Sequence, residues 1–357
     1  MLGYLETRTR IIVSVALLAT VAALILRVAA IEGVALFALS AVALAGLAAM
    51  VGEGTEQLGS RFGAGVTGVL QSALGNLPEL FIGIFALRAG LLEVVRSALV
   101  GSILANTLLV LGLAFVAGGL RHGTQRFGAT QTRMIATLLI LAVAAMAIPT
   151  IATAPGGPSS GHATQLSVIV SIVLLVVFVA SIPFSLAQGK GVAVEGPAAG
   201  HQWPLWLAAG SLLVAGVLAA FVSDWFVEAL KPAMSTLGMS QSFAGLVVVA
   251  IAGNAVENVV GVQAMLRDRG DLAISLILNS SLQVALALTP VLVILSLILG
   301  GTTLTLVLSP LLVASLALAT LLAAIVVMDG ESTWLEGLAL IGLYLIIAAS
   351  VWWGPAI

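Results

Sequence analysis

Runs of about 20 apolar residues follow one another along almost the whole chain, separated by short polar turns. We count eleven of them, at residues 11–29, 34–55, 64–88, 93–118, 130–149, 165–187, 205–228, 242–266, 271–299, 303–327 and 334–353. A helix of about 20 residues crosses the hydrocarbon core of a bilayer. The sequence therefore predicts an all-α polytopic membrane protein with about 11 transmembrane helices.

Composition leaves little material outside the bilayer. Of 357 residues, 61% are hydrophobic and 8% are charged, and the mean hydropathy is +1.22. Soluble domains carry about 25% charged residues. The net charge of −2 argues against a nucleic-acid partner, and the absence of cysteine excludes disulfides and thiolate metal sites. The three histidines fall in predicted loops, so a cation site within the spans must use oxygen ligands, which suit Ca²⁺, Mg²⁺ or Mn²⁺.

Two apolar runs contain the same polar motif. Gly75-Asn76-Leu77-Pro78-Glu79 recurs 178 residues later as Gly253-Asn254-Ala255-Val256-Glu257. Ionisable residues at membrane depth are costly and mark ion or substrate paths. Interrupted segments at matching places in two halves of a chain point to the binding site of a secondary transporter. The simpler alternative is that Asn and Glu only hold helices together through hydrogen bonds, but the duplication favours a site.

Spacing places four polar residues at one depth. Glu79 precedes Ser102 by 23 residues, and Glu257 precedes Ser280 by the same number. The predicted turns, near Leu91 and near Asp268-Arg269, lie midway, so at about 1.5 Å per residue each pair meets in adjacent antiparallel helices. Asn and Glu of each motif stand three residues apart and are expected to share a helix face. The preceding glycine weakens the helix and frees backbone carbonyls for a cation.

The motif repeat divides the chain into two similar halves. We expect an N-terminal transmembrane helix outside the repeat at 1–33, a first five-helix repeat at 34–187, a cytoplasmic linker at 188–202 and a second five-helix repeat at 203–357. Five spans per repeat give the repeats opposite orientations in the membrane. The alternative for the first apolar run is a cleaved signal peptide.

Lys and Arg predict the orientation. With the N-terminus in the cytoplasm and the C-terminus outside, nine of these residues fall on the cytoplasmic side and four, Arg27, Arg88, Arg96 and Lys231, on the outer side. Cytoplasmic loops carry the excess of positive charge, so this orientation is favoured. Arg88 and Arg96 are the weak point of the assignment.

Several segments resemble the calcium/proton exchanger branch of the calcium/cation antiporter superfamily. They are the two GN-x-x-E motifs, Thr55-Glu56-Gln57-Leu58, Gly101-Ser102-Ile103-Leu104-Ala105-Asn106, Asn279-Ser280-Ser281-Leu282-Gln283 and the turn from Asp329 to Gly337. The resemblance covers roughly residues 40–353. It implies a Ca²⁺/H⁺ antiporter of the prokaryotic plasma membrane that works by alternating access, with Ca²⁺ and H⁺ as substrates, the bilayer as partner and no permanently bound cofactor. Whether it forms a homo-oligomer stays open.

The resemblance also assigns roles to residues. It implies that Glu79 and Glu257 are the paired Ca²⁺ ligands and proton acceptors, with Gly75 and Gly253 offering carbonyls. The residues that would line the site are Asn76, Ser102, Asn106, Asn254, Ser280 and Gln283. Glu56, Glu228 and Asn258 are candidates for a proton or cation path, although solvated carboxylates at span ends explain the first two equally well.

Two positions depart from the family pattern, and they leave the transported ion open. Asn258 replaces a histidine that often follows the second motif, and Asn279 replaces the usual glycine before Ser280. A Na⁺-coupled or Mn²⁺-preferring exchanger of the same fold is therefore the alternative. A channel fits the duplicated design less well. A membrane-embedded zinc hydrolase is disfavoured because no H-E-x-x-H is present.

Overall fold

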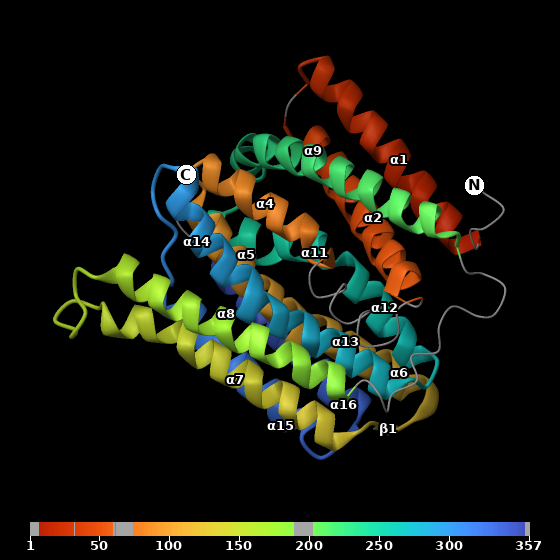
Figure 1. The fold of residues 1–357 in the computed structure, drawn as a ribbon, viewed down its shortest axis with the longest axis vertical. Coiled ribbons are helices and arrows are strands. Elements are labelled where there is room, and N and C mark those ends of the chain that lie inside the picture. The colour runs from red at the N-terminus through yellow and green to blue at the C-terminus, as the bar shows by residue number, and fades with distance from the viewer. Residues whose placement is uncertain (1–6, 32, 60, 62–73, 189–202, 354–357) are drawn as a thin grey trace. The chain divides into compact units, whose positions relative to one another are not determined.

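The computed structural model describes residues 7–31, 33–59, 61, 74–188 and 203–353, and these are almost entirely helical (Figure 1). The first half contains α1 (Thr7–Val28), α2 (Val34–Gly59), α4 (Leu77–Arg88), α5 (Leu92–Leu104), η2 (Ala105–Val110), α6 (Leu111–His122), β1 (Gln125–Arg126), α7 (Ala129–Ala152) and α8 (Ala163–Gln188). The second half contains α9 (Leu205–Leu237), α10 (Gln241–Phe243), η3 (Ala244–Val249), α11 (Ala250–Gly253), α12 (Ala255–Leu266), α13 (Gly270–Gln283), η4 (Val284–Leu288), α14 (Thr289–Leu299), α15 (Pro310–Val327), β2 (Glu331–Ser332) and α16 (Trp334–Trp352).

The all-α membrane fold predicted from the sequence is confirmed. Within the described part of the chain, nine helices are long and apolar enough to cross a membrane, and a bent helix pair at 241–266 makes a tenth candidate. The third predicted span begins in residues 62–73, and most of the predicted linker occupies 189–202. Both segments lie outside the described residues, so the count of eleven spans stays a prediction.

One predicted span is too long at its start. The run at 303–327 was expected to be helical throughout, but α15 begins only at Pro310. Gly300 and Gly301 have positive φ and end the preceding helix, and a residue before proline is disfavoured in the helical region. Ser309 instead caps α15, accepting a hydrogen bond from the Leu312 N–H.

The extended segment before α15 is held by hydroxyl groups. The backbone N–H groups of Leu304, Leu306 and Leu308 donate to Ser296 Oγ, Ser167 Oγ and Thr150 Oγ1, each at 2.9 Å. The same three leucines are buried. A buried non-helical backbone must find hydrogen-bond partners within the protein, and side-chain hydroxyls from α14, α8 and α7 provide them.

The described helices form two compact units that do not coincide with the two sequence halves. Unit 1 contains residues 1–85 and 178–238, and unit 2 contains residues 86–177 and 239–357. Each unit therefore draws helices from both halves. In unit 1, α2 packs against both α1 and α9, and α2 and α9 are the first helices of the two predicted repeats.

Unit 1 is held by close packing and by one charged cluster. A Cβ atom on Gly46 of α2 would lie 2.6 Å from the Ala16 Cβ of α1, and Phe37 stacks on Phe226 with ring centroids 5.0 Å apart. At the end of α1, Arg27 forms ion pairs with Asp224 (3.3 Å) and Glu228 (3.0 Å) of α9. These contacts fix α1 and α2 against α9.

In unit 2 the turns gather at two ends, as a bundle that alternates in direction requires. At one end, β1 pairs with β2 and the His122 ring lies 2.9 Å from the Leu266 carbonyl. At the other end, Ser242 contacts Glu93, and Ser240 donates to the Val351 carbonyl. The contacts of β1, β2, His122 and Leu266 thus mark one end of the unit, and those of Glu93, Ser240, Ser242 and Val351 mark the other.

Three spans of unit 2 contain a π-helical turn, at η2, η3 and η4. Two of them occupy matching places in the sequence repeat, because η4 begins at Val284, 178 residues after Asn106 of η2. Isolated π-helical turns inside α-helices occur frequently at functional sites. Here each of the two directly follows the helix that carries a repeated serine, Ser102 or Ser280.

Candidate ion site

The second copy of the GN motif interrupts a helix, and the first stands directly before one. In the second copy α11 ends at Gly253, Asn254 has φ −93° and ψ 23°, and α12 begins at the next residue. The helical segments on either side, 241–253 and 257–266, meet at 60°. In the first copy Gly75 and Asn76 form a turn, and α4 begins directly afterwards.

This geometry corrects the expectation that Asn and Glu of each motif share a helix face. Each Asn stands immediately before a helix, in the N-cap position, and each Glu is the third helical residue. A polar N-cap followed three residues later by Glu is the sequence pattern of a helix start. Each motif therefore marks the beginning of a helix within the apolar run, and its Asn and Glu are not two residues on one face of a continuous helix.

The position of the carboxylates has an electrostatic consequence. Glu79 and Glu257 both lie in the first turn of their helices, where the unpaired N–H groups give a partial positive charge. This charge stabilises a carboxylate without a cation. At the same break, the carbonyls at the end of α11 are the negative end of a helix, which favours cations.

The side chain of Asn254 does not cap its own helix. Its Nδ2 donates instead to Ser102 Oγ of α5 at 3.0 Å and to the Ala250 carbonyl at 2.8 Å. Its Oδ1 accepts a hydrogen bond from Asn106 Nδ2 at 3.0 Å. Asn254 is 1% exposed, so this amide joins two spans of unit 2 in a buried setting.

Asn106 extends the network to a third span. Its Nδ2 also donates to Ser280 Oγ of α13 at 3.0 Å, and Ser280 hydrogen-bonds in turn with the Glu257 carboxylate. Asn106 is fully buried, and within the described part of the chain its Oδ1 has no hydrogen-bond partner. A buried acceptor of this kind can bind a cation or a protonated carboxyl group.

We call the group Ser102, Asn106, Asn254, Glu257 and Ser280 the polar network. All five belong to unit 2, and all five were candidates from the sequence. Close backbone packing of α5 against η3 helps to hold the network, because a Cβ on Gly101 would lie 2.3 Å from the Leu246 carbonyl oxygen. Only glycine permits this approach at the residue preceding Ser102.

Other candidates are not among the five residues of the polar network. Gly253 is buried at the end of α11, and Gln283 is the last residue of α13 and half-buried. Asn258 Nδ2 lies 3.5 Å from the Ile251 carbonyl, at the limit of a hydrogen bond. Gly75, Asn76 and Glu79 belong to unit 1, where Glu79 is 6% exposed. The pairing of Glu79 with Glu257 therefore rests on the sequence repeat alone.

The two candidates for an ion path differ in their surroundings. Glu56 is exposed near the end of α2. Glu228 lies within α9, which continues nine residues beyond the predicted span end to Leu237, and it is ion-paired with Arg27. The sequence did not indicate that Asp224 joins the same cluster; its i, i+4 spacing from Glu228 was the available signal.

Comparison with known proteins supplies the family. The model of the sodium/calcium exchanger protein family matches residues 32–187 and 207–353. A Ca(2+)/H(+) antiporter of Synechocystis sp. is 34% identical over 330 residues, covering 87% of this chain and 88% of the relative. The chain belongs to the sodium/calcium exchanger family, in its calcium/proton exchanger branch. This confirms the resemblance inferred from the motifs.

Further members of the branch agree in sequence and in fold. The Ca(2+)/H(+) antiporter ChaA of Bacillus subtilis is 35% identical over 309 residues, covering 84% of this chain and 87% of the relative. The solved structure of native YfkE superposes with a TM-score of 0.83 at 30% identity, over 96% of this chain and 99% of that one. The protein is therefore an integral membrane protein of a transporter family.

Proposed function

We propose that this protein exchanges Ca²⁺ for H⁺ across the membrane by alternating access. The observation that carries the proposal is the polar network, which brings an acidic residue, two amides and two hydroxyls from three spans together inside unit 2. Oxygen ligands of this kind suit Ca²⁺. The relatives from Synechocystis sp. and B. subtilis are named as Ca(2+)/H(+) antiporters, which supports Ca²⁺ and H⁺ as the two exchanged ions.

In this proposal the two GN motifs act as equivalent halves of one site. Glu257 belongs to the network, and the sequence repeat assigns Glu79 the corresponding role in the other half. Carboxylates close enough to share an ion repel each other when both are charged and empty. Either Ca²⁺ or protons relieve that repulsion, and competition for the same oxygens couples the two ions.

Alternating access is proposed from the duplicated design of the sequence. Transporters of this kind move one bundle of helices against another around the binding site. We propose a movement of this kind here, which opens the site to each side of the membrane in turn. The N-terminus is proposed to lie in the cytoplasm and the C-terminus outside, in a prokaryotic plasma membrane.

The test is transport in proteoliposomes. A pH gradient that is acidic on the outside should drive ⁴⁵Ca²⁺ movement, and reversal of the gradient should reverse the flux. Glu257→Gln and Glu79→Gln should each abolish the flux while the purified protein stays monodisperse. Lowering the pH on the Ca²⁺ side should raise the apparent KM for Ca²⁺ and leave Vmax unchanged, as expected for competition.

Four outcomes would contradict parts of the proposal. The absence of pH-driven flux for any divalent cation would refute cation/proton exchange. Flux that stops when choline replaces Na⁺ would identify a Na⁺-coupled carrier, and preference for ⁵⁴Mn²⁺ would change the cargo. Normal transport by either glutamine variant would place the site elsewhere.

A further inference from the structure

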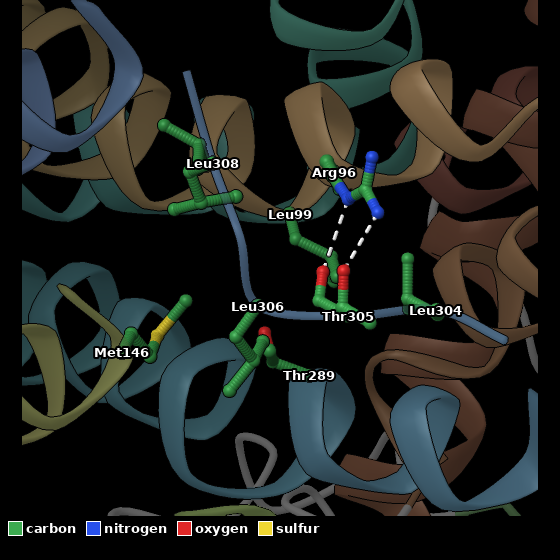
Figure 2. Close-up of a pocket in the computed structure, with 9 residues that line it drawn as sticks. Arg96, Leu99, Met146, Thr289, Leu304, Thr305, Leu306 and Leu308 are labelled. Carbon is green, nitrogen blue, oxygen red and sulfur yellow. Dashed lines mark hydrogen bonds between the residues drawn. The ribbon is translucent and has the colours of Figure 1, made fainter. Parts of the chain in front are cut away.

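Arg96 is a basic residue near the start of a span, in a protein proposed to carry cations. Arg96 is in the second turn of α5, and its side chain is 21% exposed. Its Nε donates to the Thr305 carbonyl at 3.0 Å and its Nη2 to Thr305 Oγ1 at 2.8 Å, as Figure 2 shows. An ionisable residue within a span is functional more often than structural. Arg96 is also one of the two residues that fit the predicted orientation poorly.

The charge of Arg96 is only partly balanced. Glu93 is the one acidic residue among those described that forms an ion pair with it, and the closest approach, Nη1 to Oε2, is 3.8 Å. The Glu93 carboxylate also accepts hydrogen bonds from Ser97 (3.4 Å) and Ser242 (3.2 Å). The strongest contacts of Arg96 are thus with neutral groups of Thr305, which hold the guanidinium in place without cancelling its charge.

The remaining surroundings of Arg96 screen it weakly. The small cavity beside it is lined mainly by apolar side chains, among them Leu99, Met146 and Leu306 (Figure 2). The polar exceptions are Thr289 and Thr305. Charges interact over longer distances in such surroundings than in water.

Arg96 is on the same helix as the polar network. Ser102 follows it by six residues, which is about 9 Å along the helix axis. Ser102 accepts from Asn254, and Asn106 follows in η2. A positive charge on the same helix opposes any cation that enters the network, and the effect is twice as large for a divalent as for a monovalent ion.

We propose that Arg96 is a specificity-determining residue that weakens divalent-cation binding at the polar network. The negative charge of Glu93 partly offsets this effect of Arg96. The inference rests on the proposed cation exchange and adds a control of affinity to it. By lowering affinity, Arg96 speeds release of the cargo, because an exchanger that binds its ion too tightly turns over slowly. The proposed orientation puts this charge at the outer end of unit 2.

The test compares variants that change the charge in opposite directions. We expect R96Q to lower the apparent KM for Ca²⁺ in proteoliposomes roughly tenfold, the order of magnitude that Coulomb's law gives for a unit charge about 10 Å from a divalent ion at an effective dielectric constant of about 50. E93Q should raise the KM, because it leaves Arg96 unbalanced. The double variant E93Q/R96Q should fall between the two, and R96K, which keeps the charge, should stay close to wild type.

A purely structural role gives a different pattern. If Arg96 only ties α5 to Thr305, all Arg96 variants lower Vmax, R96K included, and no KM moves in opposite directions for R96Q and E93Q. That result would overturn the inference while leaving the proposed exchange intact. A wild-type protein that moves no Ca²⁺ would overturn both proposals.

Should R96Q not reach the membrane as a monodisperse protein, E93Q decides the question alone, since it leaves the Thr305 contacts in place. An unchanged or lower KM for E93Q would then refute the inference. Replacing Ca²⁺ by a monovalent cargo or competitor adds a second readout. The shift should shrink to about a third of its fold-change, because the Coulomb energy is halved.

Discussion

Asn106→Ala tests the polar network most directly, because this residue connects three spans. Asn106 is fully buried and its Nδ2 donates to both Asn254 and Ser280 at 3.0 Å. Interhelical hydrogen bonds in membrane proteins contribute about 0.6 kcal/mol on average and up to about 1.7. Loss of both bonds therefore costs about 1–3 kcal/mol. The side-chain Oδ1 of Asn254 also loses the donor Asn106 Nδ2, which adds about 1 kcal/mol or more.

The expected result is a protein destabilised by about 2–4 kcal/mol in total, whose midpoint of thermal denaturation in detergent falls by several degrees. Transport of ⁴⁵Ca²⁺ should fall more than stability explains, because Asn254 and Ser280 lose their fixed orientation. The matched control is Thr107→Val. Thr107 is equally buried in η2, but its hydroxyl donates only to the Ile103 carbonyl of its own helix at 2.7 Å.

Thr107→Val should cost less than about 1 kcal/mol and leave transport close to wild type. An Asn106→Ala protein that melts and transports like wild type would show that the network is not coupled to transport. If Thr107→Val lost as much as Asn106→Ala, packing within η2, and not the hydrogen bonds, would explain the effect.

Three further predictions concern stability. Gly101→Ala should lower the denaturation midpoint and reduce the yield, because the added Cβ would lie 2.3 Å from the backbone of Leu246. The control Gly342→Ala in α16 should be neutral or raise the free energy of unfolding by up to about 1 kcal/mol, because no described atom lies within 4 Å of the added Cβ. Thr289→Val should leave stability unchanged or raise it slightly in the same melt, because the buried Thr289 hydroxyl has no hydrogen-bond partner among the described residues; a loss above about 2 kcal/mol would reveal a partner. Thr333→Ala should cost about 1 kcal/mol, because Thr333 and Glu336 form a reciprocal cap at the start of α16, and Thr333→Ser should restore it.

The sequence was sufficient for the family, the all-α fold and the places where most helices turn. The predicted turns near Leu91 and Asp268 fall between α4 and α5 and between α12 and α13. Hydrophobic run length and the duplicated motif carry this information, because backbone groups in lipid must be satisfied within a helix. These are local properties that residue order alone expresses.

What the sequence did not give depends on contacts between distant segments. Hydropathy alone made residues 303–309 look like the start of a span, whereas hydroxyls from three other helices satisfy this backbone in an extended form. The Asn of each GN motif was expected inside a helix, but it directly precedes one. The side chain of Asn254 donates a hydrogen bond to Ser102 Oγ and does not cap its own helix. The hydrophobic periodicity of a sequence does not indicate which distant group a side-chain amide will hydrogen-bond.

The charges show the same limit. Arg96 was counted on the outer side and was a weak point of the orientation, and the sequence did not indicate its contact with Thr305, 209 residues away. Arg27 looked like an ordinary end of a span, yet it joins Asp224 and Glu228. Counting Lys and Arg per loop predicts orientation but not which of them a folded chain neutralises.

The duplicated π-helical turns bear on how such a chain tolerates change in length. A π-helical turn holds one residue more per hydrogen-bonded ring than an α-helical turn, i to i+5 in place of i to i+4. Removal of one residue from η2 can therefore be absorbed by closing that ring, so that Ser102 before it and α6 after it keep the faces they present. The same deletion within α5 would rotate Ser102 by about 100° away from Asn254. The two spans that contain η2 and η4 can thus each lose one residue at the π-helical turn without rotating the serine that precedes it.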